Sequence, residues 1–388
     1  MLIIADDISG AAECAGVGWR RGLDAELCTD SSAGDLAGCS VIDTDSRLLP
    51  DAEAAARVQA VMDGSGPKPG DVFKKTDSVL RGPVRAELEV LVRVLGCRRC
   101  LLVPTNPPQG RTVERGRLLM RGVPLDQTEF ARDPHHPAHS ADVRDLLGQE
   151  IALPVVSLAL GDPWPERGIC IGDARTDEDL RAWAARAFDS GIPVAGSAPF
   201  LSAVLAQRGC EERRPDVAPV EGAHGLRTLI CSGSASPASR DRIRQAEAAG
   251  VPVCRLPSDL ALSGGTVLER DKALSFAFPQ VATTILCIGG PVSRDPGAPE
   301  RLLEALAGLV AQCFSAQRVD HLLLEGGATA ACVLRRLGMH RFRVIREWAP
   351  GVVTLRAVNG RGPEITIKPG SYPWLGPFAE ALAASEQA

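Results

Sequence analysis

The segment KKTDSVLRG, residues 74–82, places lysine, aspartate, serine, arginine and glycine between an apolar segment and a helix-like segment. Residues 72–73, Val and Phe, precede it, and residues 84–91 repeat apolar side chains at helical spacing. This order predicts a strand, a loop and a helix, and open α/β sheets bind ligands at such strand ends. The alternative is a polar loop in which Asp77 or Ser78 only caps the helix.

Two adjacent carboxylates follow the first apolar segment of the chain. Residues 1–5 indicate a buried strand, and Asp6 and Asp7 come directly after it. Ser9 and Gly10 allow the backbone to approach a ligand or to cap a helix. Because adjacent carboxylates repel each other unless a cation or a hydrogen-bond donor lies between them, the pair favours a functional role over an ordinary cap.

The order of strand, polar exit and helix recurs in both halves, which predicts two α/β domains with largely parallel sheets. Further strands are expected near residues 23–28, 40–43, 101–104, 169–172, 193–195, 228–231, 283–288 and 320–325. The alternating apolar segments at 352–356 and 364–367 flank an Asn-Gly pair at 359–360 and are predicted to be antiparallel.

Length and composition indicate a globular protein of two domains. The chain has 388 residues, which is too long for one ordinary core, and 45% of them are hydrophobic. Residues 211–225 are charged, rich in Pro and Gly and without periodicity. This segment predicts a linker between an N-terminal domain, residues 1–210, and a C-terminal domain, residues 226–388.

Charge and hydropathy exclude several classes of partner. The formal net charge of −5 argues against sequence-independent nucleic-acid binding, which needs clustered Lys and Arg. No apolar segment has the length of a transmembrane helix, and the N-terminus lacks the basic region of a signal peptide. We therefore expect a cytoplasmic protein without a nucleic-acid or membrane partner. The twelve scattered Cys predict reduced structural thiols, with a redox or zinc role for the CxxC pair Cys97 and Cys100 as the alternative.

Three loops in the second half combine glycine with small residues at predicted strand ends: residues 232–239, 289–290 and 326–330. Such a loop before a helix offers backbone N–H groups and a positive dipole end to an anion. None matches GxGxxG or GxxxxGKS/T, so a nucleotide would bind neither at a dinucleotide fingerprint nor at a P-loop. Lys368 and Gly370 end another strand, where the lysine either binds phosphate or only solvates the strand end.

Residues 133–140 contain half of the six His, which suggests metal binding because imidazole suits zinc. However, prolines make this segment an irregular loop, and no Cys or paired acid completes a ligand set. We therefore expect a solvated loop and assign no metal ligand.

Several segments, in the same order over nearly the full chain, resemble the four-carbon acid sugar kinases, which phosphorylate acids such as threonate, erythronate and 3-oxo-tetronate. The family motifs ADDxTGA, KKxDSTLRG, PxxPxxGRT and DPxxPxxS correspond to residues 5–11, 74–82, 104–112 and 133–140. The GSxS and GGxTA turns correspond to residues 233–236 and 326–330. The first two motifs are specific, whereas the glycine turns alone would not be.

The resemblance implies an ATP-dependent kinase with an acid-sugar-binding N-terminal domain, a nucleotide-binding C-terminal domain and an active-site cleft between them. Mg²⁺ is expected to bridge the ATP phosphates, held largely by water. Arg81 would bind the substrate carboxylate, and Lys74 or Lys75 would add positive charge. Asp7 or Asp77 would accept the proton of the reacting hydroxyl or position that hydroxyl.

The resemblance also implies further contacts. Substrate contacts are expected from Asp6, Ser78 and Arg111. Nucleotide contacts are expected from the glycine loops and the end of the last strand: Ser234, Ser236, Gly326, Gly327, Ala328, Thr329, Lys368 and Gly370.

This chain departs from the family pattern at two places. Val79 stands where Thr is usual, which removes a hydroxyl from the substrate loop, and residues 368–374 replace the usual KSGxFG end. The substrate could therefore differ from the familiar acids.

Two other functions stay open. A nicotinamide-dependent dehydrogenase of a hydroxy-acid requires a glycine fingerprint followed by an acid about twenty residues later, which the sequence lacks. A catalytically silent metabolite-binding protein would keep residues 74–82 without turnover. The protein could form a homo-oligomer under any of these three functions.

Overall fold

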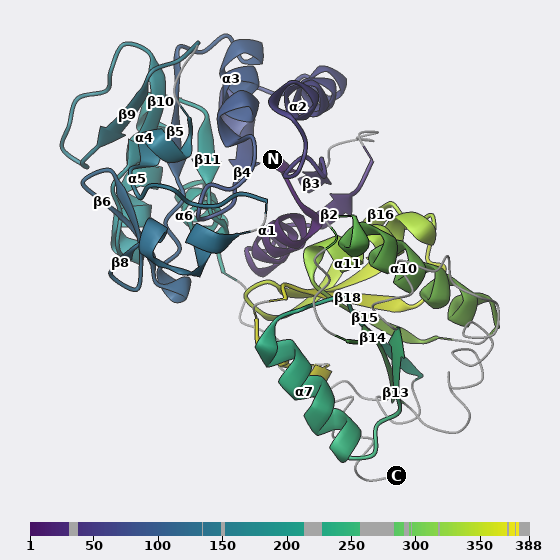
Figure 1. The fold of residues 1–388 in the computed structure, drawn as a ribbon. Coiled ribbons are helices and arrows are strands. Elements are labelled where there is room, and N and C mark those ends of the chain that lie inside the picture. The colour runs from purple at the N-terminus through teal and green to yellow at the C-terminus, as the bar shows by residue number, and fades with distance from the viewer. Residues whose placement is uncertain are drawn as a thin grey trace. The chain divides into compact units, whose positions relative to one another are not determined.

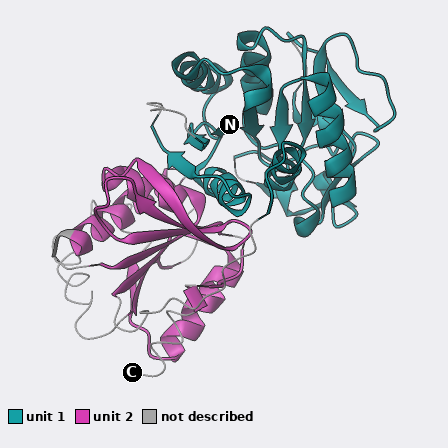
Figure 2. Ribbon diagram, turned by 180° about the vertical axis from the view of Figure 1, so that it is seen from behind, with its two compact units in different colours: residues 1–214 teal, residues 215–388 magenta. Residues whose placement is uncertain are grey.

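The computed structural model describes residues 1–30, 38–133, 135–148, 152–212, 227–256, 283–290, 295, 297–316, 319–370, 372–376 and 378–379. The chain forms two compact units, Met1–Arg214 and Pro215–Ala388 (Figures 1 and 2). Each unit is an α/β domain with a largely parallel sheet, as the sequence predicts. The unit boundary falls in the predicted linker 211–225, of which residues 213–225 lie outside the described residues. The cleft between the domains stays a prediction.

The N-terminal unit contains a parallel sheet with the strand order β2-β3-β1-β4-β11-β5-β10-β9. Its strands are β1 (Leu2–Ala5), β2 (Ala25–Cys28), β3 (Cys39–Asp43), β4 (Val72–Lys75), β5 (Arg99–Val103), β9 (Val155–Leu158), β10 (Gly168–Gly172) and β11 (Val194–Gly196). Most of these strands are short apolar runs buried on both faces, as expected for a parallel sheet covered by helices. At Gly196 an added Cβ would lie 2.1 Å from the carbonyl oxygen of Val103, so β11 can approach β5 only with glycine there.

Helices cover both faces of this sheet. They are α1 (Ile8–Arg20), α2 (Asp51–Ser65), α3 (Val84–Val94), α4 (Val143–Leu146), α5 (Asp177–Ser190) and α6 (Ala198–Gln207). Helix α2 packs against α3, and α6 packs against α1 and α5 (Figure 1). A separate antiparallel sheet contains β6 (Arg111–Glu114), β7 (Arg117–Met120) and β8 (Val123–Pro124). This small sheet lies in a region whose local pattern predicts no regular element.

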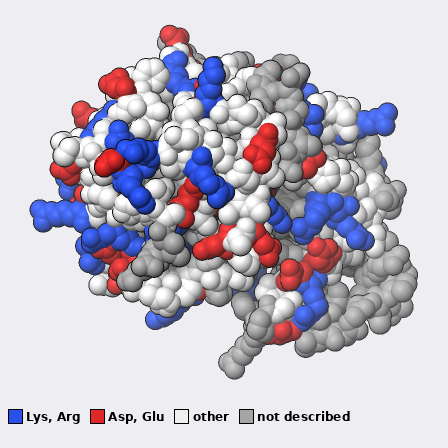
Figure 3. Space-filling view, turned by 90° about the horizontal axis from the view of Figure 1, so that it is seen from above, with Lys and Arg blue, Asp and Glu red and all other residues white. Residues whose placement is uncertain are grey.

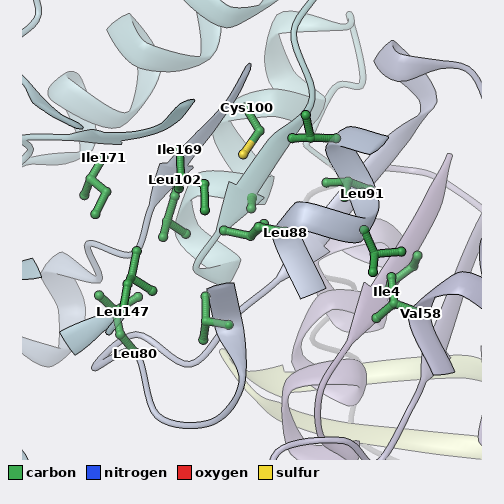
Figure 4. Packing of buried hydrophobic residues seen from close by; sticks show 14 of the residues in the cluster. Ile4, Val58, Leu80, Leu88, Leu91, Cys100, Leu102, Leu147, Ile169 and Ile171 are labelled. Atoms are coloured by element: carbon green, nitrogen blue, oxygen red, sulfur yellow. The ribbon is translucent and has the colours of Figure 1, made fainter. Parts of the chain in front are cut away.

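A hydrophobic cluster fills the space between the sheet, α2 and α3. It includes Ile4 of β1, Val58 of α2, Leu88 of α3 and Leu102 of β5 (Figure 4). Leu80 of the KKTDSVLRG loop belongs to the same cluster, although its φ of 62° is unusual for a residue with a side chain. Full burial of a leucine contributes about 1.5–3 kcal/mol, so the core anchors this loop.

The C-terminal unit contains the strand order β13-β14-β12-β15-β18-β17-β16. Its strands are β12 (Thr228–Ser232), β13 (Val253–Leu256), β14 (Thr283–Ile288), β15 (His321–Glu325), β16 (Arg341–Ala349), β17 (Val352–Ala357) and β18 (Glu364–Lys368). Its helices are α7 (Pro237–Ala248), α10 (Ala298–Ala316) and α11 (Gly327–Arg336). The first five strands in this order, from β13 to β18, are parallel, whereas β17 pairs antiparallel with β18 and β16, which confirms the predicted antiparallel segment.

The structure also shows the distribution of surface charge, the character of the helices and the state of the cysteines. On the face shown in Figure 3, acidic and basic side chains are interspersed. Within the described ranges, no helix has both the length and the apolar character that a membrane span requires. All twelve Cys lie in described residues as thiols outside any disulfide, and burial raises the pKa of the Cys100 thiol.

Candidate active site

Arg47 joins the two adjacent carboxylates at the end of β1. Its Nε and Nη2 donate to Asp6 at 2.7 and 3.0 Å, and its Nη1 and Nη2 each donate to Asp7 at 2.8 Å. This is the cation that the repulsion argument requires. Burial has the largest single effect and would raise the pKa of Asp6, but Arg47, Lys74 and Lys75 together outweigh it and lower this pKa. Sequence reasoning missed Arg47, which reaches the pair from the segment after β3.

Asp7 serves as a helix cap and as a partner of Arg47 at the same time. Its carboxylate accepts a hydrogen bond from the backbone N–H of Gly10 at 2.8 Å, which caps α1. The Asp7 side chain is 20% exposed, whereas that of Asp6 is 2% exposed. Of the two carboxylates, Asp7 is therefore the one that a ligand can reach.

The Asp77 carboxylate accepts hydrogen bonds from residues of its own loop. It accepts from Arg81 Nε at 2.9 Å and Nη2 at 3.0 Å, and from the backbone N–H groups of Val79 and Arg81 at 3.3 and 3.2 Å. Burial alone would raise the pKa of Asp77, but Arg81 and Arg47 hold it well below the usual range. Val79, where the family has Thr, is 2% exposed and belongs to the hydrophobic cluster.

Arg81 and Arg111 flank the ring of Phe130, each 5.5 Å from its centroid. Arg81 also donates from Nη1 to Asp133 at 3.1 Å, so two carboxylates already occupy its guanidinium. Arg111 donates to the hydroxyl of Ser78 but pairs with no carboxylate among the described residues, and its buried Nε has no partner there. Arg111 is thus the less neutralised cation of the two.

A cavity of about 290 Å³ opens beside Arg81. Residues 79–82, Phe130 and residues 135–139 contribute to its lining. Asp133 accepts from the backbone N–H groups of His135 and His136 and from Arg81, so it ties the His-containing loop to Arg81. No group of three or more potential metal-ligand side chains occurs in the part of the chain that the structure describes.

The two lysines of KKTDSVLRG point into the interior. The Lys74 ammonium lies 2.9 Å from Glu87 of α3, and the Lys74 side chain has no exposed surface to offer a ligand. Lys75 donates to the carbonyl of Thr76 at 2.9 Å and lies 3.8 Å from Glu13. Its side chain is 6% exposed.

Asp43 is a site carboxyl that sequence reasoning did not select. It ends β3 opposite Ala5 of β1 and is 5% exposed. The backbone N–H of Asp45 donates to it at 2.9 Å, but no cation in the described ranges pairs with it. Burial, and to a lesser extent Asp7, raise the pKa of Asp43 well above its usual value.

In the C-terminal unit, three predicted segments meet at the ends of the neighbouring strands β12, β15 and β18. The backbone N–H of Gly233 donates to the Thr329 hydroxyl at 3.2 Å. A Cβ added to Gly370 would lie 3.4 Å from Ser234 Oγ and 3.8 Å from Gly326 Cα. These glycines allow the three backbones to approach one another closely.

The start of α11 is open to an anion. Gly326, with φ 94°, precedes this helix, and no side chain caps its first turn. In contrast, Ser236 caps α7 by accepting from the N–H of Ser239 at 3.2 Å. Ser234 Oγ donates to Ser236 Oγ at 3.1 Å. The amides of residues 327–329 therefore fit a phosphate group better than those of α7 do.

Lys368 lies below these loops rather than at their surface. Its ammonium pairs with Glu325 at 2.9 Å and donates to the carbonyls of Pro369 and Tyr372 at 2.8 and 2.6 Å. The side chain is fully buried, and this burial lowers its pKa although Glu325 opposes the shift. Of the altered 368–374 segment, Ser371 lies outside the described residues.

The family models match both halves of the chain. A sugar-binding N-terminal domain matches residues 1–204, and a nucleotide-binding C-terminal domain matches residues 229–372. The chain belongs to the four-carbon acid sugar kinase family. The resemblance drawn from the motifs is thereby confirmed.

Named relatives of this family align over most of their length. A D-threonate kinase of Cupriavidus necator is 30% identical over 380 residues, covering 90% of this chain and 89% of its own. A D-threonate kinase of Salmonella typhimurium is 26% identical over 426 residues, covering 100% and 98%. A 3-oxo-tetronate kinase of Methylobacterium radiotolerans is 28% identical over 423 residues, covering 98% and 97%. These names agree with the predicted kinase class and favour neither the dehydrogenase nor the silent binding protein.

Two solved structures share the fold of this four-carbon acid sugar kinase family member. A Salmonella typhimurium protein has a TM-score of 0.77 at 18% identity and covers 99% of this chain and 98% of its own. The Haemophilus influenzae protein HI1011 has a TM-score of 0.71 at 20% identity and covers 99% of both chains.

Proposed function

We propose that this protein is an ATP-dependent kinase that phosphorylates a hydroxyl of a four-carbon sugar acid. The observation that carries the proposal is the cluster at the ends of β1 and β4. Asp7 follows β1, and the under-neutralised guanidinium of Arg111, at the start of β6, bonds the Ser78 hydroxyl in the loop after β4. A nearby cavity of about 290 Å³ lies at the small end of the range for ligand sites, which suits a short acid.

Arg111 is the proposed anchor of the substrate carboxylate. The expected anchor, Arg81, already gives its Nε and both Nη atoms to Asp77 and Asp133. Arg111 has donors left after its bond to Ser78, and a guanidinium can hold a carboxylate through two parallel hydrogen bonds. Arg81 would contribute only when the substrate displaces Asp133.

Asp7 is the proposed partner of the reacting hydroxyl. Both carboxylates accept hydrogen bonds on both oxygens, Asp77 from Arg81 and Asp7 from Arg47, so accessibility decides between them. The Asp7 side chain is the more exposed of the two, at 20% against 7%. Phosphoryl transfer depends mainly on positioning and charge neutralisation, so the proposed role of Asp7 is to position the hydroxyl.

The C-terminal unit is the proposed ATP site. The uncapped first turn of α11, Gly326 and Thr329 would hold the phosphates, and Ser234 and Gly370 would border them. ATP supplies the γ-phosphoryl group, and Mg²⁺ is proposed to accompany it with mostly water ligands. The bond network of Lys368 supports a role below the loops instead of a direct phosphate contact.

The test compares Arg111→Ala with Arg117→Ala, an exposed arginine on the adjacent strand β7. With threonate, erythronate and 3-oxo-tetronate as substrates and ADP release as the readout, Arg111→Ala should lower kcat/KM for the acid about 100-fold. This loss corresponds to about 2–3 kcal/mol, as expected for a charged hydrogen bond. The KM for ATP should not change, and Arg117→Ala should match the wild type.

Arg81→Ala gives a useful contrast. It leaves Asp77 and Asp133 unpaired, so it should lower the melting temperature as well as the activity. Near-normal turnover of Arg111→Ala would exclude Arg111 as the anchor. Absence of ADP release by the wild type with every four-carbon acid would exclude the proposed function.

A further inference from the structure

A chain of buried polar groups connects helix α3 to the end of β1. The Lys74 ammonium lies 2.9 Å from Glu87 Oε2, and the Ser46 hydroxyl donates to Glu87 Oε1 at 2.5 Å. Ser46 Oγ lies 2.7 Å from Thr44 Oγ1, which donates to the carbonyl of Ala5 at 2.8 Å. The side chains of Lys74 and Glu87 are 0% and 1% exposed.

A gain in stability alone does not account for this row of buried polar groups. Removing two charges from water costs about as much as their attraction returns, and apolar residues of similar volume often stabilise a core equally well or better. In some proteins a buried ion pair instead holds one conformation against alternatives. The question is therefore which segment the pair holds in place.

The row of buried polar groups ends at residues 44–47, the segment that carries Arg47. The backbone N–H groups of Ser46 and Arg47 donate to the carbonyl of Asp6 at 2.9 and 3.1 Å. Within this segment Asp45 has φ 45°, a left-handed conformation that persists in a residue with a side chain only when the surroundings hold it. Glu87 provides such a hold through the side chain of Ser46.

We propose that Glu87 is a positioning residue for the kinase reaction. By fixing residues 44–47 through Ser46, it keeps the Arg47 guanidinium on both Asp6 and Asp7 and thereby orients the Asp7 carboxylate. This inference rests on the proposed function only for the role of Asp7. Glu87 itself contacts neither Asp7 nor a ligand-exposed surface.

The segment has a second attachment that makes the inference testable in a folded protein. Arg57 of α2 donates from Nη1 to the carbonyls of Thr44 and Asp45 at 2.6 and 3.0 Å. Because this attachment does not involve Glu87, loss of the buried acceptor should loosen residues 44–47 without releasing them.

The decisive comparison uses two double variants that both remove the buried charges. Lys74→Met/Glu87→Met removes the acceptor that joins Ser46 Oγ to α3 and leaves it the Thr44 hydroxyl, whereas Lys74→Met/Glu87→Gln keeps an amide oxygen that can accept from Ser46. The Met/Met variant should lose kcat roughly 10- to 100-fold, the range in which a misplaced reacting group acts. The Met/Gln variant should recover most of it. Melting temperatures of both, and the KM for ATP, should stay close to wild type.

A second readout does not depend on turnover. The Nε–H of Arg47 donates to Asp6 at 2.7 Å, so its ¹H–¹⁵N signal should exchange slowly with water in the wild type and in Met/Gln. The signal, assigned by its absence in Arg47→Lys, should exchange faster in Met/Met.

Two outcomes would overturn the inference. One is equal kcat values and equal exchange in all three proteins. The other is equal impairment of both double variants, because the Ser46 bond would then be irrelevant. Failure of the proposed function would instead appear as absent ADP release by the wild type, while the exchange comparison still reports on Glu87.

Discussion

Asp43 lacks the cation that neutralises its two neighbouring carboxylates. Arg47 donates hydrogen bonds to both Asp6 and Asp7. Asp43 accepts from the backbone N–H of Asp45, and no cation in the described ranges pairs with it. Its pKa in the folded protein lies well above the ordinary value of 3.8, chiefly because of burial. The native state therefore binds more protons here than the unfolded state does, and this group's contribution to stability falls as the pH rises above about 4.

Asp43→Asn should stabilise the fold at pH 7. The amide keeps an oxygen for the Asp45 N–H and avoids the cost of ionisation, which is about 1.4 kcal/mol for each pH unit between the folded and unfolded pKa. Urea unfolding at pH 7 and pH 4 measures the effect, and the advantage should shrink at the lower pH. Asp189→Asn, on the exposed end of α5, serves as the control. If Asp43→Asn proved less stable than the wild type at pH 7, the burial argument would be contradicted.

Side-chain direction is the part of the site that the sequence could not supply. A lysine at a strand end can face the ligand or the interior, and only the folded partner decides. For Lys74 the partner is Glu87, one turn into α3, and for Lys368 it is Glu325 on the neighbouring strand. Similarly, Val79 follows the proposed substrate contact Ser78 in sequence but packs into the core.

At the scale of elements, close approach of three loops defines the proposed ATP site. At Gly233 there is no room for a side chain, because an added Cβ would lie 2.5 Å from Thr329 Oγ1 and 2.8 Å from Leu303 Cδ2. These atoms belong to α11 and α10, so the overlap is relieved only when side chains of both helices or the loop itself shift. The loop after β12 therefore depends on glycine for its position over α11.

Gly233→Ala should raise the KM for ATP several-fold and destabilise the protein by about 1–3 kcal/mol, as overpacking does. Gly308→Ala is the matched control, because Gly308 is inside α10 and an added Cβ there meets no atom within 4 Å. This control should be neutral or stabilising by up to about 1 kcal/mol. Steady-state kinetics and thermal unfolding check both variants. A wild-type KM for ATP in Gly233→Ala would argue against the proposed nucleotide site.

Elements that carry a strong local pattern were predictable, and those defined by pairing were not. Short apolar runs followed by polar or glycine exits predicted most parallel strands of both units, but β9 and β13 were not predicted. The small sheet of β6 to β8 was missed because its strands are short and only partly buried. Strand β16 was missed because charged residues interrupt its apolar pattern.

At the scale of the whole molecule, stability toward acid depends on a buried polar chain in the C-terminal unit. His321 Nε2 lies 2.8 Å from Thr366 Oγ1, which lies 2.7 Å from Thr354 Oγ1, and Trp348 donates to Thr354 at 2.7 Å. These hydrogen bonds connect β15 to β16 through β18 and β17. Burial of His321 lowers its pKa from 6.5 to about 4, because the charged imidazolium is poorly solvated there.

The unfolding free energy should therefore fall as the pH is lowered from 6.5 to 4. In this window the unfolded His321 binds a proton and the folded one does not, so stability rises with pH and is lost on acidification. The loss at pH 4 is about 3 kcal/mol at most. Denaturant unfolding across this range measures it, with His321→Leu as the comparison. The variant should show a flatter pH dependence whatever its absolute stability, and an unchanged slope would assign the acid sensitivity to other groups.

The anchoring of Leu80 in the core has a consequence for engineering a new acceptor range. With φ 62° and 3% exposure, Leu80 couples the shape of the KKTDSVLRG loop to the packing of the hydrophobic cluster. A library that randomises the whole loop would then consist mostly of variants that fail to fold. Phe130 packs against the same cluster, and Arg111 is the proposed carboxylate anchor. Directed evolution toward acids of other length or stereochemistry should therefore keep these residues and begin with the exposed cavity-lining residues His135 and His139.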